Sequence, residues 1–388
     1  MNIDRVKIKN FKSLRDVDIQ LSNLTLITGV NSTGKSSFIQ SLLLLRQNKE
    51  IINTFTMYSM MLKTPDKNKE FLEYVHSKLY NLSFLIQGKY VSLGDKKRIF
   101  FENTFNENIK IEIDSEDINL NITFDKELKT KIKSNKNKNF QIINLFQENF
   151  QYIQTDRIAP AITYKLSETD IQNNSIGLQG EYTAHYLAEK KDQAIFLDKL
   201  KHKDSVTNQL LENVSLWLNE ISQGIDISST VNPSQNNVTL TYSYKYNEGR
   251  TNEYNPLNVG FGITYVLPII VSILKAKKGD LLIIENPESH LHPAGQSKIA
   301  ELCAIASANG VQIIVETHSD HFLNGVRVAT KKGLLKPSDS KIYYFSKEFG
   351  ELETKIDEIN IDKNGKIDNW VQGFFDEYDK QLDELIEW

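Results

Sequence analysis

Cysteine is nearly absent from the sequence, in which Cys303 is the single example. An internal disulfide framework is therefore excluded, and the composition fits a reducing compartment. Long apolar runs are missing too, because none approaches the roughly 20 residues that a transmembrane helix needs. The first residues, MNIDRVKIKNF, alternate charged and apolar positions and lack the apolar segment of a signal peptide. We therefore expect a cytoplasmic protein without a membrane partner.

An excess of positive charge is missing as well, since 46 Lys and Arg stand against 50 Asp and Glu and the net charge is −4. The chain as a whole lacks the basic character of a nucleic-acid-binding protein, so any DNA contact would need a local patch. The strongest basic run falls between residues 126 and 138. It could follow a phosphate backbone, but its richness in lysine and asparagine favours a loose, solvated loop.

The arrangement of apolar residues is typical of a globular α/β protein. Residues 3–28 alternate apolar and polar positions and end in an apolar run, after which apolar residues recur at helical spacing over 38–45. The same texture resumes near residue 256, with apolar strands at 281–284 and 311–315 around a helix near 294–308. In the chain between these parts, the patterns predict helices over 50–80 and 181–222 and strands over 84–125 and 225–246.

This order predicts one α/β head, with a mixed or antiparallel β subdomain, that is split by a helical and β insertion. The predicted divisions are an N-terminal lobe (1–46), an insertion (47–255), a C-terminal lobe (256–346) and a tail (347–388). Within the tail, Asn364-Gly365 predicts a hairpin turn, and periodic apolar residues after Asp376 predict an amphipathic helix.

A glycine-rich motif, G-x-x-x-x-G-K-S, lies between the first apolar run and the helical segment that follows it. Glycines let backbone N–H groups wrap around phosphates, and a helix N-terminus adds a positive dipole end. Lys35 would place its charge on the β- and γ-phosphates, and the Ser36 hydroxyl would bind Mg²⁺. The predicted nucleotide-binding residues are Gly29, Asn31, Ser32, Thr33, Gly34, Lys35, Ser36 and Ser37. The alternative is a chance match in a turn rich in glycine, serine and asparagine.

An acidic residue should lie at the end of a neighbouring strand, where it can reach Mg²⁺ through water. Glu285 follows the apolar run 281–284 and is our candidate for this metal-side acid. Glu288 is our candidate to polarise the attacking water, although a glutamate there could instead cap the next helix. His318 follows the run 311–315 and could donate to the γ-phosphate or the water; the alternative is a core histidine bonded to the backbone.

Together these motifs resemble the ABC-type ATPase heads of the RecF, Rad50 and overcoming-lysogenisation-defect group. More closely, the chain resembles bacterial AAA-family ATPases that carry a C-terminal domain of unknown function. Further segments that carry the resemblance are Ile39–Gln47, Asp156–Pro160, Gly180–Ala184, Asn258–Gly262 and Asn369–Asp376. The resemblance implies ATP and Mg²⁺ as cofactors, and it implies that Gly260, Phe261 and Gly262 stand at the signature loop, followed by a helix over 263–273.

The family geometry implies a head-to-tail homodimer or higher oligomer, in which the signature helix of one copy faces the γ-phosphate held by the other. This sequence departs from the family at two places. Asn286 stands where ABC heads usually carry a glutamate that activates water, and the Leu-Ser-Gly-Gly signature is absent. Because an amide cannot accept a proton, either Glu288 takes over this catalytic role or turnover is slow.

Relatives of this kind lie beside, or are fused to, nucleases or other toxic effectors. The residues after His318 are too few for a fused nuclease domain, so the resemblance implies a separate effector chain and a DNA or phage-derived trigger. We therefore expect the ATPase component of an antiphage defence system. The alternatives are a RecF-like DNA repair ATPase and a slow or non-hydrolysing nucleotide-gated scaffold. A transporter ATPase fits neither the insertion nor the tail.

Two other patterns could suggest a separate metal site, but neither favours one. The histidines at 290, 292, 318 and 321 lack the helix-borne i,i+4 pair of a typical zinc site, and the ATPase interpretation already uses several of their neighbours. Asn360–Val371 resembles a calcium loop, but its twelfth position is Val371 where a calcium loop carries glutamate.

Overall fold

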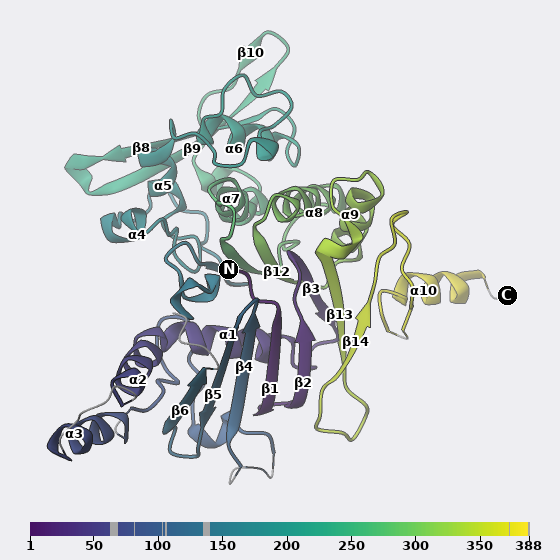
Figure 1. Ribbon diagram of the computed structural model, residues 1–388. Coiled ribbons are helices and arrows are strands. Elements are labelled where there is room, and N and C mark those ends of the chain that lie inside the picture. Colours follow the sequence, from purple (N-terminus) through teal and green to yellow (C-terminus); the bar gives the residue numbers. More distant parts are fainter. Residues whose placement is uncertain are drawn as a thin grey trace. The chain divides into compact units, whose positions relative to one another are not determined.

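The computed structural model describes residues 1–62, 69–80, 82–102, 104, 107–134, 140–371 and 373–386 of the chain. The chain divides into two compact units. Figure 1 shows the ribbon of the chain, coloured along the sequence. We call residues 1–21, 30–147 and 345–357 the first unit, and residues 22–29, 148–344 and 358–388 the second unit. Each unit is assembled from stretches that are distant in sequence. The predicted lobes, insertion and tail stay a prediction.

A five-stranded antiparallel sheet with the order β2-β1-β4-β5-β6 forms the centre of the first unit. In β4 and β5 every second residue is buried, as expected for an antiparallel sheet with one covered face. The strands are β1 (Arg5–Phe11), β2 (Leu14–Gln20), β4 (Ile109–Ser115), β5 (Ile118–Phe124) and β6 (Thr130–Ser134).

Three helices of the first unit follow the glycine-rich motif: α1 (Lys35–Gln47), α2 (Lys49–Leu62) and α3 (Lys69–Tyr80). They confirm the predicted helix after the motif and the helical character of the segment that follows. The face of α1 that carries Phe38, Ile39 and Leu42 is buried, so α1 is anchored by apolar contacts that leave its N-terminal turn fixed in place.

The predicted loose loop at residues 126–138 was wrong in part. Lys131 and Lys133 lie in β6 and pair with Thr123 and Asn121 of β5. These lysines are exposed and alternate with less exposed residues, so the segment fits a pleated edge that local composition did not reveal. Lys136 and Lys138 lie outside the described residues.

A six-stranded sheet with the order β14-β13-β3-β12-β11-β7 is built mainly from the second unit. Strands β3, β12, β11 and β7 are parallel, and β3, β11 and β12 are buried almost throughout. Parallel strands covered on both faces require such continuous apolar runs. The strands are β3 (Leu24–Gly29), β7 (Gln151–Ile153), β11 (Leu281–Glu285), β12 (Gln312–Glu316), β13 (Ser340–Ser346) and β14 (Lys355–Ile359).

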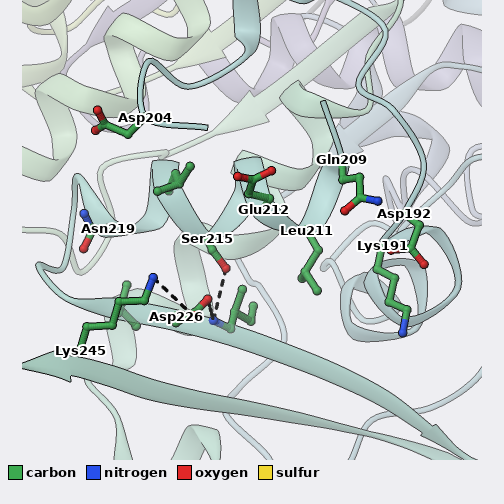
Figure 2. A pocket seen from close by; sticks show the side chains of 13 residues that line it. Lys191, Asp192, Asp204, Gln209, Leu211, Glu212, Ser215, Asn219, Asp226 and Lys245 are labelled. Atoms are coloured by element: carbon green, nitrogen blue, oxygen red, sulfur yellow. Dashed lines mark hydrogen bonds and ion pairs between the residues drawn. The ribbon is translucent and has the colours of Figure 1, made fainter. Parts of the chain in front are cut away.

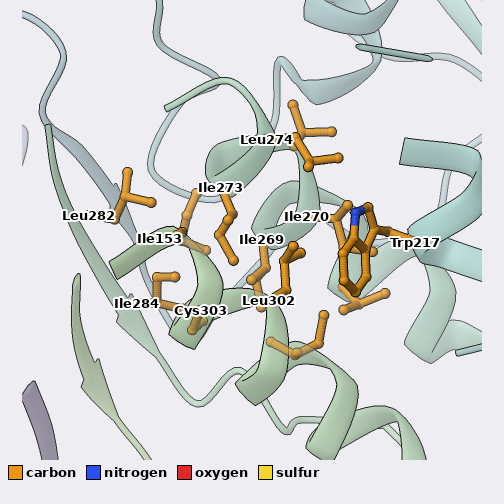
Figure 3. Packing of buried hydrophobic residues seen from close by; sticks show 14 of the residues in the cluster. Ile153, Trp217, Ile269, Ile270, Ile273, Leu274, Leu282, Ile284, Leu302 and Cys303 are labelled. Atoms are coloured by element: carbon orange, nitrogen blue, oxygen red, sulfur yellow. The ribbon is translucent and has the colours of Figure 1, made fainter. Parts of the chain in front are cut away.

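Helices α7 (Phe261–Leu274) and α8 (Pro293–Ala308) pack on this sheet, and α9 (Asp320–Lys331) packs on α8 (Figure 1). Figure 3 shows the core between them, where Ile269 and Ile273 of α7 lie near Ile284 of β11 and Cys303 of α8. Cys303 is fully buried, and burial raises the pKa of its thiol to about 12. The helices predicted near 263–273 and 294–308 are confirmed.

The rest of the second unit contains a three-stranded sheet and several shorter helices. The predicted helical stretch 181–222 is interrupted by irregular chain between α5 and α6, where Ala194 and Gln209 form a bridge. The Asn364-Gly365 turn is confirmed by a bridge between Ile361 and Ile367. These elements are α4 (Glu168–Gln172), α5 (Thr183–Lys190), α6 (Leu210–Asn219), β8 (Ile225–Asn232), β9 (Asn237–Tyr246), β10 (Gly249–Arg250) and α10 (Glu377–Ile386). Among the described residues no helix has the length and apolar character to cross a membrane.

Candidate nucleotide site

The glycine-rich motif forms a tight turn at the start of α1. Ser32 and Gly34 adopt positive φ angles of 65° and 102°. A Cβ added to Gly34 would lie 2.5 Å from Thr354 Oγ1 and 2.6 Å from Ser13 Oγ, so glycine is required both for conformation and for space. Within the described chain, no side chain caps α1 and no acidic residue lies in its first turn. The positive end of this helix therefore suits an anion.

Lys35 is 4% exposed, and its ammonium group donates a 2.7 Å hydrogen bond to the carbonyl oxygen of Val30. The Thr33 hydroxyl donates a 2.8 Å hydrogen bond to the same carbonyl. The ammonium group of Lys35 is thus held at the glycine-rich turn, to which Lys35 itself belongs. The Ser36 side chain is exposed in the first turn of α1, where a hydroxyl could bind a metal ion. Asn31 and Ser32 are exposed in the same turn.

Three parallel strands of the second unit end at one edge of the sheet. Glu285 pairs with Glu316, and Glu316 pairs with Ile27, two residues before the Gly29 that opens the glycine turn. The carboxyl ends of parallel strands are the usual ligand-facing edge of an open α/β sheet. The fold therefore brings Gly29, Glu285 and the segment leading to His318 to the same edge, as their positions after apolar strands predicted.

Glu285 is held at this edge by Tyr152 of β7 and by Thr155, which follows β7. Its carboxylate accepts hydrogen bonds from the Tyr152 hydroxyl at 3.0 Å and from the Thr155 hydroxyl at 3.1 Å. Burial and the adjacent carboxylate raise the pKa of Tyr152 well above its usual range, so the hydroxyl stays a donor at neutral pH. Thr155 also donates to the side-chain oxygen of Asn286 at 2.7 Å. These contacts orient an acid that could reach a cation directly or through water.

Glu288 connects the segment after β11 with the segment after β12. Its carboxylate accepts from the Thr317 hydroxyl and from the backbone N–H of His318, both at 2.8 Å, and from the Asn286 amide at 3.4 Å. A carboxylate offers about four acceptor positions, so one remains for a further donor such as water. The alternative role as a helix cap was wrong, because α8 is capped by His292.

His318 lies just beyond β12 with an exposed side chain. The alternative of a core histidine was therefore wrong. His290 belongs to an aromatic cluster, with its ring 4.8 Å from those of Phe261 and Tyr265. His290 therefore has a role in packing and His292 a role in capping α8, and these roles account for both histidines.

Gly260 is the N-cap residue of α7, and Phe261 and Gly262 lie in its first turn, so the helix begins two residues before the predicted 263. A Cβ on Gly262 would collide with the carbonyl oxygen of His290, so this glycine is required by the chain itself. Gly260 differs, because its φ is −55° and an added Cβ would meet no described atom within 4 Å. Nothing inside the described chain explains glycine at position 260. Phe261 is 42% exposed beside it.

Sequence reasoning missed Tyr152 and Thr155 as site residues and quoted Arg157 only for the resemblance. Tyr152 lies in β7, and Thr155 and Arg157 follow it; β7 spans only Gln151–Ile153 and is too short to produce a clear periodic signal. The hint was the polar segment that begins at Gln154, directly after Tyr152 and Ile153. Parallel pairing of β7 with β11 brings it to the acidic strand end.

A cavity of about 470 Å³ in the second unit lies apart from these residues (Figure 2). It lies between α6 and the β8–β9 hairpin, and Glu212, Asp226 and Lys245 are among its lining residues. None of the predicted site residues lines it. This cavity is therefore separate from the predicted site residues at the strand ends.

Comparison with known proteins agrees with this geometry. Residues 24–324 match the family described as "AAA domain, putative AbiEii toxin, Type IV TA system", and residues 335–385 match "Protein of unknown function (DUF3696)". No curated protein compared with the chain matches it.

Two solved structures share the fold. The first, an Smc head bound to the C-terminal winged-helix domain of ScpA, is 14% identical with a TM-score of 0.54, covering 94% of this chain and 99% of that one. The second, from Pyrococcus furiosus, is an Smc head with an extended coiled coil bound to the C-terminal domain of ScpA. It is 13% identical with a TM-score of 0.50, and the match covers 100% of both chains. The α/β fold of this chain is that of ABC-type ATPase heads, and its C-terminal segment belongs to DUF3696. The chain therefore belongs to the AAA-domain family whose description names a putative AbiEii toxin.

Proposed function

We propose that this protein is an ABC-type switch ATPase that binds ATP with Mg²⁺ and hydrolyses it slowly. The observation that carries the proposal is the common edge at which β3, β12 and β11 end, with Gly29 opening the phosphate turn and Glu285 among the residues at that edge. Membership in an ATPase family supports nucleotide as the ligand. Gly29 and the residues Asn31–Ser37 would hold the phosphates, and Ser36 with Glu285 would hold Mg²⁺.

In this proposal Glu288 polarises the attacking water and His318 stabilises the charge that develops on the phosphate. Glu288 has one acceptor position left for a water, and the exposed His318 ring follows the residue whose hydroxyl orients Glu288. Asn286, in the position where ABC heads usually carry glutamate, donates to Glu288 and accepts from Thr155. An amide in this role orients neighbouring groups without taking a proton, which favours slow turnover.

Phosphate release from Mg-ATP tests this function. The wild type should turn over repeatedly, whereas Lys35→Ala should lose nucleotide binding and turnover together because the phosphates lose their main cation. Multiple turnovers by Lys35→Ala, or unchanged nucleotide affinity, would contradict the proposal. Binding without turnover in the wild type would favour the second candidate, a nucleotide-gated scaffold, for which Asn286 is the supporting observation.

We further propose that two copies close head to tail over the nucleotide. Gly260 supports this arrangement, because no described atom of its own chain requires the absence of a side chain there. A close approach by a second copy's phosphate would supply the missing reason. Sedimentation of the wild type with and without Mg-ATP tests the proposal. We expect a dimer that forms only with nucleotide, and a nucleotide-independent monomer would contradict it.

A separate effector chain completes the proposed system, which we assign to antiphage defence. The support is the family description, which names a putative toxin, together with the Smc heads that are bound to ScpA in their solved structures. Copurification with the product of the neighbouring gene, with and without Mg-ATP, tests this assignment. A nucleotide-dependent complex with a nuclease or other toxic protein is expected. A complex with DNA repair proteins would favour the RecF-like alternative.

A further inference from the structure

The guanidinium of Arg157 is buried at the carboxyl end of β11. The residue is 3% exposed, and its Nη2 donates hydrogen bonds to the carbonyl oxygens of Glu285 and Asn286, the second at 2.9 Å. Its Nε and Nη1 have no hydrogen-bond partner among the residues that the structure describes. Burying a cation with open donors costs free energy. In a purely structural role, a buried arginine would therefore cost more free energy than a neutral side chain.

The charge of Arg157 persists despite its burial. Burial lowers its pKa to about 10, while the charges of Glu288, Tyr265 and Glu285 oppose the decrease. The side chain is thus cationic at neutral pH. Its hydrogen bonds hold the main chain at Glu285 and Asn286, where Asn286 adopts a positive φ of 44° that non-glycine residues adopt rarely.

The guanidinium of Arg157 also contacts helix α7. Its central carbon lies 5.5 Å from the centre of the Tyr265 ring, a cation–π arrangement. The Tyr265 ring lies 4.7 Å from Phe261 and 4.8 Å from His290. Arg157 therefore contacts the first turns of α7 on one side and the acidic strand end on the other.

We propose that Arg157 is a positioning residue that couples the first turns of α7 to the acidic end of β11. The inference rests on the proposed head-to-tail pair, in which Gly260 and Phe261 meet the second copy. A shift of α7 on closure would move Tyr265, and the guanidinium stacked on it would carry the carbonyls of Glu285 and Asn286. Both carbonyls accept from Nη2, and the planar guanidinium can donate in its own plane while it stacks on a ring, whereas a lysine ammonium is a compact point charge without that plane.

Full-length Arg157→Met, Arg157→Lys, Tyr265→Leu and Tyr265→Phe test this coupling, with the exposed Arg250→Met as the matched control. We expect Arg157→Met to lower kcat about 10- to 100-fold while the Kd for Mg-ATP stays within about twofold. Tyr265→Leu should lower kcat similarly, and Tyr265→Phe should retain it because the ring remains. The double variant Arg157→Met/Tyr265→Leu should lose no more than either single variant, since both break one connection.

A purely structural role would give a different pattern. Loss of kcat, nucleotide affinity and thermal stability together in Arg157→Met would overturn the inference. Wild-type kcat in Arg157→Met, or full rescue by Arg157→Lys, would overturn it as well. Arg250→Met should match the wild type in every measurement.

Hydrogen exchange keeps this test separate from the test of the ATPase function. The Asn286 N–H donates to the Glu316 carbonyl oxygen at 2.8 Å, so exchange in residues 285–292 reports on the strand end. Arg157→Met and Tyr265→Leu should both raise exchange there without nucleotide, whether or not the wild type releases phosphate. Unchanged exchange in both variants would overturn the coupling, whereas absent phosphate release with raised exchange would count only against the proposed ATPase function.

Discussion

The Thr354 hydroxyl donates a 2.8 Å hydrogen bond to the carbonyl oxygen of Thr33, although 321 positions separate the two residues. Thr354 Oγ1 also lies 2.9 Å from Ser13 Oγ, and the Thr354 N–H donates to the Ser13 carbonyl oxygen at 3.0 Å. The glycine turn is therefore braced by a residue far along the chain. Its shape depends on tertiary contacts as well as on its glycines.

Thr354→Val should loosen this turn. The variant keeps the volume of the side chain but leaves the Thr33 carbonyl without its donor, which costs about 1–3 kcal/mol in a buried site. We expect a lower free energy of unfolding and nucleotide affinity weakened about tenfold, equivalent to about 1.4 kcal/mol. Denaturant unfolding and equilibrium binding of Mg-ATP measure the two effects. Thr330→Val, which removes a buried hydroxyl from α9, should lower stability with unchanged affinity; equal affinity losses in both would refute a specific brace.

Two glycines two residues apart at the start of α7 should respond oppositely to alanine. Gly262→Ala forces a Cβ against the His290 carbonyl oxygen and should destabilise the protein by about 1–3 kcal/mol. Gly260→Ala has space and an ordinary φ, so the midpoint of thermal unfolding should stay at the wild-type value. Gly260→Ala should nevertheless weaken ATP-dependent dimerisation, measured by sedimentation. Normal dimerisation by Gly260→Ala would remove the support that this glycine gives to a head-to-tail pair.

Glu288→Gln should separate binding from hydrolysis. The amide oxygen can still accept from Thr317 or His318, but the side chain can no longer take a proton from water. We expect nucleotide affinity close to wild type and phosphate release lowered about 100-fold or more. Single-turnover phosphate release measures the chemical step. Full activity in Glu288→Gln together with its loss in Glu285→Gln would move the water-polarising role to Glu285.

The stability of the second unit should depend on pH through Glu220. Lys298 donates to this carboxylate at 3.0 Å, and that hydrogen bond, reinforced by His202, lowers the pKa of Glu220 from 4.5 to about 2. A carboxyl group with a lowered folded-state pKa stabilises the protein fully above the unfolded pKa. The contribution is then lost as the pH falls from about 4.5 towards 2.

Thermal unfolding of the wild type and Glu220→Gln at pH 7 and in the acid range checks this expectation. The wild type should be the more stable protein at pH 7, and the difference should shrink as the pH falls below about 4.5. In a Lys298→Met background the difference at pH 7 should be smaller, because the main donor to Glu220 is absent. A difference that is constant with pH, or that grows in acid, would contradict the assignment.

The strongest sequence patterns gave correct structural predictions where the physical cause of the structure is local. The apolar runs before Gly29 and Glu285 became buried parallel strands, because strands covered on both faces need continuous apolar side chains. The prediction of a loose loop at 126–138 was wrong in part, because β6 forms by pairing with β5 and composition alone does not identify a pairing partner. The gap between α5 and α6 has the same origin, since its bridge joins Ala194 to Gln209.

Residue spacing was enough to predict the phosphate turn, the helix after it and the acid after an apolar strand, because glycine freedom, helix dipoles and strand burial act over a few neighbouring residues. Tertiary structure alone decided what surrounds those groups. Tyr152 donates to Glu285 from 133 positions away, and Arg157 bonds to the carbonyl of Glu285 from 128 positions away. Such contacts arise only when β7 pairs with β11, and that pairing depends on the whole folded sheet.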